Sequence, residues 1–228
     1  DGAGRLIAHA IGNEPFAVAQ ISATVDGNPT ANFSYALVSR YEGELGVAVG
    51  LKTAYAMPFD QIYTVIQKNI MLSAATDAGY DIQGAATGIT YPSRNPLWMV
   101  AVDPAACGLA GNPMHLGPGC FLLNENVRWG ILFHELGHNS THNSWNEFGT
   151  GGVHLALTGG DVPLYQEGNA TLIGLYTMQK ITATGYGLNA PTLDGMRKIF
   201  QNDTQLYTTR LKDYEQSGAV FTENGSPP

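Results

Sequence analysis

The sequence predicts an α+β fold, in which a β-rich N-terminal part precedes a mostly helical part. Alternating and apolar segments separated by turn residues fill residues 1–56. Segments with helical periodicity and capping residues dominate residues 124–216. A run of strands followed by a run of helices is typical of α+β proteins. With 228 residues, the chain is long enough for one sizeable core. We therefore expect a single domain over 1–228, and its start at Asp1 indicates either a processed form or an excised piece of a longer protein.

The predicted strands are short alternating or apolar segments bounded by turn residues, namely 16–25, 36–41, 45–49 and 97–102. The first ends at the turn signal Asp26-Gly27. The second and third flank Glu42-Gly43-Glu44, so we expect them to pair as a hairpin. The last is continuously apolar, which is typical of a buried strand. Residues 103–120 are rich in Gly and Pro and predict a loop.

The predicted helices have capping or proline residues at their starts and cover 59–77, 124–142, 161–184, 192–201 and 203–216. We expect Gly79 and Gly84 to end the first helix. Asn124 is the expected N-cap of the second helix, and Asp161 of the third. Residues 149–160 are rich in Gly and Thr and predict the loop between these two helices.

The charge of the chain excludes several classes of partner. Lys and Arg number 11 against 19 Asp and Glu, so the formal net charge is −8. A chain with this balance and no basic run is unsuited to binding nucleic acid or an anionic membrane. No apolar run approaches the roughly 20 residues that a membrane-spanning helix needs. We therefore expect neither a nucleic-acid partner nor a membrane span.

Cys107 and Cys120 are the only two cysteines, and an even count favours a disulfide bond and an oxidising compartment. A bridge between them would close a short loop around Met114 and His115. Closing a loop of that length is worth about 3 kcal/mol in the chain-entropy model. The bridge would either stiffen the rim of a cleft or staple a surface loop.

A metal-binding motif lies in residues 129–139, which contain His134-Glu135-x-x-His138. Helical residues four apart share a face, so both imidazoles can point at one ion. Neutral imidazole suits Zn²⁺, and we expect one zinc ion. Glu135 directly follows the first ligand and would act as general base on water beside the zinc. The pattern suits hydrolysis of a peptide carbonyl.

Two histidines leave a catalytic zinc site one ligand short. The candidates for the third ligand are His142, Glu147, His154, Asp161 and Glu167. Glu167 is favoured, because a glutamate on a second, antiparallel helix is the usual way to complete such a site. Glu147 lies where the motif helix ends, so reaching the zinc would need a sharp reversal of the chain. His142 shares the motif face but lies one turn too far along it, near the rim.

Several segments within residues 97–178 resemble segments of the enhancin-like (M-sixty type) metallopeptidases. Trp129-Gly-x-x-x-His-Glu-Leu-Gly-His-Asn139 is similar to the family's zinc motif, in which a glutamate follows His-Glu-x-x-His after a variable gap. Residues 167–176 resemble the family's glutamate helix. Met99–Asp103 and Met114-His115-x-Gly117 resemble a strand and a loop of the same family. The resemblance covers about residues 97–178 and departs at Thr171, where the family usually has Asn.

The resemblance implies a gluzincin-like zinc endopeptidase that is secreted or exposed on the cell surface, with His134, His138 and Glu167 as ligands. Several family members cleave mucin-type glycoproteins, so the implied partner is a protein or O-glycosylated protein substrate. Two alternatives stay open. One is a catalytically silent glycoprotein-binding module, against which Glu135 argues, since such a module would need no base. The other is a zinc amidase that acts on cell-wall peptides.

Polar and aromatic residues on loops near the motif are candidates for binding substrate, namely Asn112, His115, Asn143, Trp145 and Asn146. Each of them could equally be an ordinary solvated loop residue. His115, Tyr165 and Tyr176 are candidates for stabilising an oxyanion. We further expect residues 121–123 to form an edge strand that could pair with an extended substrate.

Overall fold

The computed structural model describes residues 16–25, 28–39, 45–88, 97–101, 107–111, 113–117, 121–123, 126–141 and 162–217. The chain divides into two compact units, Asp1–Leu45 and Gly46–Pro228. Strands followed by helices confirm the predicted α+β fold. The unit boundary falls inside the β-rich range 1–56, and one domain over the whole chain stays a prediction.

The N-terminal unit contains a pair of antiparallel strands, β1 (Phe16–Val25) and β2 (Asn28–Ser39). Val25 lies opposite Asn28, so these strands pair across the predicted Asp26-Gly27 turn. β3 (Leu45–Val49) belongs to a different sheet. The hairpin predicted between residues 36–41 and 45–49 is therefore wrong, because β3 pairs with β4 (Thr53–Pro58) in the sheet of the second unit.

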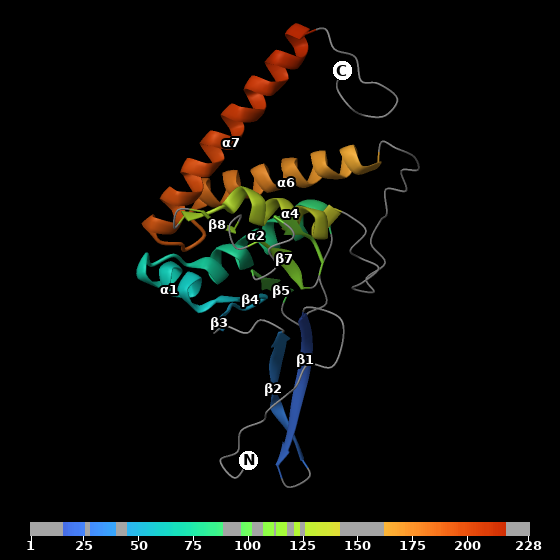
Figure 1. Cartoon of the computed structure of the whole chain (residues 1–228), viewed down its shortest axis with the longest axis vertical. Helices are drawn as coiled ribbons and strands as arrows, with labels where there is room; N and C mark the ends of the chain where they lie inside the picture. Colours follow the sequence, from blue (N-terminus) through green and yellow to red (C-terminus); the bar gives the residue numbers. More distant parts are fainter. Residues whose placement is uncertain are drawn as a thin grey trace. The chain divides into compact units, whose positions relative to one another are not determined.

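The larger sheet of the second unit has five strands in the order β3-β4-β5-β7-β6. Figure 1 labels β3, β4, β5 and β7 of this sheet. Its other strands are β4 (Thr53–Pro58), β5 (Leu97–Val100), β6 (Gly108–Leu109) and β7 (Met114–Leu116). β4, β5 and β7 are parallel, whereas β6 runs antiparallel to β7 at the sheet edge. β5 confirms the predicted buried strand. The loop predicted over 103–120 is wrong at β6 and β7, which are too short to show a period.

Two helices replace the single one predicted over 59–77, namely α1 (Phe59–Gln67) and α2 (Leu72–Thr87). The chain breaks at Asn69, whose φ of 53° lies in the left-handed region that Asn tolerates well. Gly79 does not end α2. A side chain there would collide with the ring of Phe133, so Gly79 instead lets α2 approach α4 (Trp129–Thr141). The helix ends at Gly88, where φ is 72°.

The motif helix, α4, covers Trp129–Thr141 and begins later than the predicted cap at Asn124. Strands β8 (Leu122–Leu123) and β9 (Asn126–Val127) precede it and form a separate antiparallel pair. Only Leu122–Leu123 of the expected strand at 121–123 forms a strand, and it lies outside the five-stranded sheet, whose edge strands are β3 and β6. Leu132, Phe133 and Leu136 are fully buried and fix α4 in the core.

Helix α6 (Val162–Thr184) confirms the predicted helix over 161–184. A single helix, α7 (Ala190–Ser217), replaces the two predicted at 192–201 and 203–216. Asn202 separates the two predicted segments and Asp203 begins the second, but each costs a helix only a few tenths of a kcal/mol. The first half of α7 buries Leu193 and Met196, and its later half is mostly exposed. Among the described residues, no helix combines the length and apolarity that crossing a bilayer requires.

A buried polar network holds α4 between α2 and α6. The side-chain amide of Gln83 donates to the Phe133 carbonyl at 3.0 Å and to Thr177 Oγ1 at 3.1 Å. Ser140 Oγ donates to Gln83 Oε1 at 2.7 Å. Asn139 is also buried and exchanges two hydrogen bonds with the backbone of Gly111. Losing one partner of such a network leaves buried polar groups unsatisfied, so these bonds fix the motif helix.

Candidate metal centre

Three predicted metal ligands meet at the contact between α4 and α6. His134 and His138 lie one turn apart on α4, and Glu167 lies on the second turn of α6. One ligating atom from each of them lies within 4.8 Å of the others. No other such group of three or more His, Cys, Asp or Glu occurs among the residues that the structure describes. The cluster could bind a metal ion.

The ligating atoms are close enough to share one ion. His134 Nε2 lies 3.0 Å from Glu167 Oε2 and 3.0 Å from His138 Nε2, and His138 Nε2 lies 3.3 Å from Glu167 Oε1. The two imidazoles are perpendicular, with ring centroids 4.6 Å apart. Two neutral imidazoles that face each other through their lone pairs repel, whereas a cation between them would attract both.

Two glycines bring α4 and α6 into close contact at this site. A Cβ at Gly137 would lie 2.7 Å from Ile173 Cγ2 and 2.8 Å from the Ala170 carbonyl oxygen. A Cβ at Gly174 would lie 3.1 Å from the His134 amide nitrogen. A Cβ would collide at Gly137 and would be unusually tight at Gly174, so the helix backbones approach closely. This approach places Glu167, on α6, within reach of the α4 histidines.

Thr171 orients one of the histidines and was missed as a site residue by the sequence analysis. Its Oγ1 lies 3.1 Å from Nδ1 of His134. When Thr171 Oγ1 accepts a hydrogen bond from Nδ1–H of His134, the available lone pair of this imidazole is on Nε2, which faces His138 and Glu167. The sequence feature that could have identified Thr171 is its spacing from Glu167. Thr171 follows Glu167 by four residues, so the two side chains share one helix face.

Glu135 lies beside the cluster but is not one of its ligands. Its side chain is largely buried, with 8% of the residue exposed, whereas 61% of the Glu167 side chain is exposed. Gly108 on β6 leaves no room for a Cβ, since that atom would collide with Glu135. Burial and, secondarily, the Glu167 carboxylate raise the pKa of Glu135 to about 7. A cation at the cluster would act in the opposite direction by offsetting the charge of Glu167.

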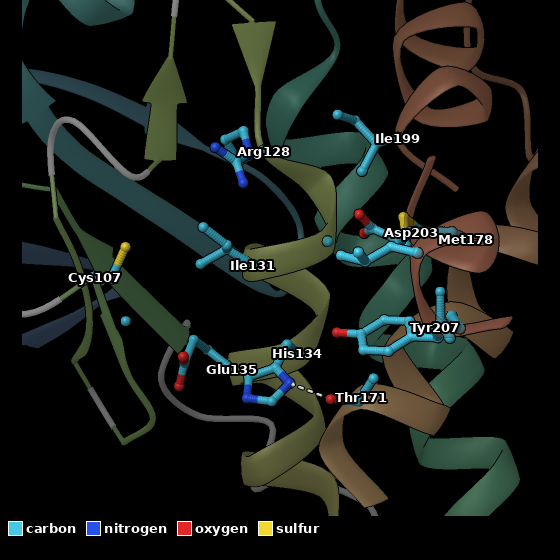
Figure 2. A pocket seen from close by; sticks show the side chains of 14 residues that line it. Cys107, Arg128, Ile131, His134, Glu135, Thr171, Met178, Ile199, Asp203 and Tyr207 are labelled. Atoms are coloured by element: carbon cyan, nitrogen blue, oxygen red, sulfur yellow. Dashed lines mark hydrogen bonds between the residues drawn. The ribbon is translucent and has the colours of Figure 1, made fainter. Parts of the chain in front are cut away.

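A pocket of about 320 Å³ extends from His134 and Glu135 toward α7 (Figure 2). Its apolar walls come from three helices and include Ile131, Leu175, Met178 and Ile199. Figure 2 shows Tyr207 pointing its hydroxyl from α7 into this pocket, on the side of α4 that carries His134. Arg128 and Asp203 also line this pocket, and burial raises the pKa of Asp203 despite the opposing effect of Arg128.

Other predicted site residues lie apart from this pocket or outside the described residues. His115 is on β7, opposite Val100 and Leu109, and does not line the pocket. Tyr176 is partly exposed on α6, where the Lys180 ammonium lies 5.3 Å from its ring centroid. The side chain of Tyr165 is not described. The remaining candidates lie outside the described residues, namely Asn112, His142, Asn143, Trp145, Asn146, Glu147, His154 and Asp161.

Cys107 lines the wall of the pocket and is disulfide-bonded. Its carbonyl accepts a hydrogen bond from the Gly117 amide at 3.0 Å, which ties the start of β6 to the end of β7. Cys120, the only other cysteine of the chain, lies outside the described residues. The role of the bridge, at the rim of a cleft or as a staple of a surface loop, stays a prediction.

No protein-family model matches the chain, and no curated protein matches it either. The resemblance to enhancin-like metallopeptidases therefore stays a prediction that rests on the motifs within residues 97–178. What the structure adds is independent of that resemblance. It brings a histidine pair and a glutamate from separate helices together, beside a buried carboxylate and a pocket.

Proposed function

We propose that this chain is a zinc-dependent endopeptidase that hydrolyses extracellular proteins. The observation that carries the proposal is the convergence of His134, His138 and Glu167, with Glu135 buried next to them. Two imidazoles and one carboxylate are a common ligand set of catalytic zinc, and three protein ligands leave a coordination position open. Structural zinc sites are instead closed by four protein ligands.

The spacing of the ligating atoms supports zinc as the metal. Two ligands of a tetrahedral zinc, each about 2.0–2.1 Å from the ion, lie roughly 3.3–3.4 Å apart. The three ligand pairs here are separated by 3.0, 3.0 and 3.3 Å, so a small outward movement would accommodate the ion. Glu167 is exposed enough to make that adjustment. Thr171 would hold His134 in the tautomer that zinc requires.

In this proposal, zinc supplies Lewis acidity toward a substrate carbonyl and lowers the pKa of a nearby water. Glu135 accepts the proton of the attacking water and later passes it to the leaving amine. The absence of a side chain at Gly108 leaves room for the Glu135 carboxylate, which is buried beside the cluster. Tyr207 presents a hydroxyl to the same pocket and can donate a hydrogen bond to a substrate carbonyl oxygen.

The proposed substrates are secreted or cell-surface proteins, with O-glycosylated, mucin-type proteins as the class that the family resemblance favours. The disulfide-bonded Cys107 supports an oxidising, extracellular setting. A glycoprotein-binding module without activity would have no use for a buried carboxylate beside its metal ligands, so Glu135 favours an enzyme. An amidase that acts on cell-wall peptides would use the same chemistry and would differ from the proposed endopeptidase only in its substrate.

Cleavage of matched substrates tests this proposal. Zinc-loaded protein is incubated with a Ser/Thr-rich peptide that carries one O-linked sugar, with the same peptide lacking the sugar, and with a cell-wall peptide. We expect cleavage of the glycopeptide, preference over the bare peptide, and a loss of at least about 10²-fold in kcat for Glu135→Gln at unchanged zinc content. Equal cleavage of both peptides would remove the glycan claim. Cleavage of the cell-wall peptide alone would favour the amidase, and no cleavage of any would favour the binding module.

A further inference from the structure

The pocket beside the metal centre follows one face of α4. Arg128, directly before the helix, is followed at spacings of three and four residues by Ile131 and Glu135, so all three share that face. Figure 2 shows Ile131 between the other two. Gly130, which also lines the pocket, lies one turn before His134, or about 6 Å along the helix axis. The pocket therefore has space for a group that reaches from the metal centre toward the start of α4.

The side walls of this pocket are apolar and come from α4, α6 and α7, namely Ile131, Leu175, Met178, Ile199 and Leu206. Its volume of about 320 Å³ lies near the lower end of the range for small-ligand sites, roughly 300–1,000 Å³. A pocket of this size suits one large side chain of a bound polypeptide better than a longer segment. The thioether of Met178 favours an aromatic side chain, since sulfur and aromatic rings attract each other.

Asp203 adds a carboxyl group to this pocket near the start of α4. A Cβ at Gly130 would lie 2.3 Å from Asp203 Oδ2, so the carboxyl group lies against the first turn of α4. Arg128 attracts this carboxylate, yet burial still raises the pKa of Asp203. Arg128 thus compensates the buried carboxylate only in part, and a hydroxyl group of a ligand would stabilise it further by donating a hydrogen bond.

The charges that line the pocket select against charged ligands. Arg128 would repel a Lys or Arg side chain, whereas Asp203 and Glu135 would repel an acidic one. A purely apolar side chain would displace water from the Asp203 carboxylate without offering a donor in its place. A phenol avoids each of these costs, because its ring contacts the apolar walls and its hydroxyl can donate to Asp203.

We propose that this pocket binds a tyrosine side chain of the substrate, next to the cleaved peptide bond, and that Leu206 and Asp203 determine this preference. Leu206 contacts the ring from the later half of α7, and Asp203 accepts the hydrogen bond of the phenol. Binding of the side chain is independent of catalysis, whereas its role in choosing the cleavage site rests on the proposed peptidase function.

Binding is tested on full-length, zinc-loaded Glu135→Gln protein, which should not cleave the probes. The probes are blocked peptides Gly-Gly-X-Gly-Gly, in which X is Tyr, Phe, Ala, Lys or Glu, and their affinities are measured by NMR titration. Added Leu206→Trp fills part of the pocket from its wall. Leu211→Trp is the matched control, because Leu211 is also exposed on α7 but lies outside the pocket lining that the structure describes.

We expect the Tyr peptide to bind at least about tenfold more tightly than the Ala, Lys and Glu peptides, as for a large side chain that enters a matching pocket. Leu206→Trp should remove most of this difference and leave binding of the Ala peptide unchanged, whereas Leu211→Trp should preserve the difference. Equal binding of the Tyr and Ala peptides, tighter binding of the Lys peptide, or equal effects of the two substitutions would overturn the proposal.

Comparison of the Tyr and Phe peptides tests the role of Asp203. The Tyr peptide should bind about tenfold more tightly, as for one hydrogen bond to a charged group. Asp203→Ala should remove this difference, whereas Asp203→Asn should retain most of it, because the amide oxygen still accepts a hydrogen bond from the phenol. A preference for Phe, or a preference for Tyr that survives in Asp203→Ala, would show that Asp203 does not read the hydroxyl.

Cleavage by protein with Glu135 intact tests the role in substrate choice. When a single Tyr is moved along a longer peptide, the cut should move with it at a fixed offset. Leu206→Trp should lower kcat/KM for these peptides by about tenfold or more, and Leu211→Trp should not. Binding of Tyr without cleavage of any peptide would contradict the proposed peptidase and leave the pocket assignment intact. Cleavage at positions unrelated to Tyr would overturn the role in substrate choice and leave the peptidase intact.

Discussion

Gly174 on α6 lies directly against the backbone of His134 on α4, and a Cβ there would stand 3.1 Å from the His134 amide nitrogen. Gly137 makes the reciprocal approach from α4, against the backbone of Ala170. The distance between the two helices is therefore set by two glycines, one on each helix. Since Glu167 and the histidines belong to different helices, this distance also sets the geometry of the metal centre.

Replacing Gly137 with Ala should separate the helices. Its Cβ would lie 2.8 Å from the Ala170 carbonyl oxygen, a backbone atom that cannot move without α6. We expect a loss of about 1–3 kcal/mol in the free energy of unfolding, as for overpacking of a core, and weaker zinc binding. Denaturant unfolding of the zinc-free protein and zinc titration measure the two effects.

Gly168→Ala provides the control for stability. No atom lies within 4 Å of a Cβ built at Gly168, and this residue is also on α6. Alanine there should stabilise the protein by up to about 1 kcal/mol through helix propensity alone. If Gly137→Ala were as stable as Gly168→Ala, the close approach at Gly137 would not be what limits the helix spacing.

Thr171→Val should weaken zinc binding without altering the ligands themselves. The substitution keeps the shape of the side chain but removes the Oγ1 that lies 3.1 Å from His134 Nδ1. Loss of such an outer partner typically reduces metal affinity by about 10–100-fold. Thr171→Ser keeps the hydroxyl and should restore most of the affinity, measured by competition with a chromogenic chelator. Equal affinities for the Val and Ser variants would show that the hydroxyl does not orient His134.

The histidine pair could be predicted from the sequence because a helical period places it, whereas Glu167 is favoured because a glutamate on a second helix usually completes such a site. Residues 134 and 138 share a face whatever the rest of the fold does, and Glu167 lies near the start of a predicted helix. The adjacent pocket could not be predicted, because α7 supplies part of it and residues 203 and 207 are distant from the motif in sequence. Contacts of that kind depend on tertiary packing, which no local pattern encodes.

The errors in the predicted fold have local physical causes. Asn69 adopts a left-handed conformation and breaks a helix that the apolar spacing alone would continue. Gly79 marks a packing contact with Phe133 and not a helix end. Strands β6 and β7 depend on pairing with their neighbours, since two or three residues carry no period of their own. Composition therefore indicated a loop where the structure has the sheet edge beside Glu135.

Glu167→Ala should reduce zinc affinity by more than about 100-fold, because it removes one of three ligands. This loss exceeds that expected when a residue such as Thr171, which contacts a ligand but not the metal, is removed. Glu147→Ala, the rival position from the sequence, should leave affinity close to that of the unchanged protein. Both variants are loaded with zinc, dialysed against a chelator and measured by elemental analysis. Retention of zinc in Glu167→Ala together with its loss in Glu147→Ala would transfer the third ligand to Glu147.

The side chain of Asp203 carries a partly buried carboxyl group that packs against Gly130 at the start of α4. Burial raises its pKa, and Arg128 offsets that effect only in part. The folded state therefore binds this proton more tightly than the unfolded state, in which the pKa is about 3.9. The stability that this proton binding contributes is fully present below the unfolded-state pKa and is lost as the pH rises through the folded-state pKa.

Asp203→Asn removes the ionisation, so we expect a higher Tm than for the unchanged protein at pH 7 and a smaller difference in Tm at pH 4. Thermal unfolding of both proteins across this pH range measures the effect. A difference in Tm that does not vary with pH would show that the carboxyl acts through packing and not through its charge.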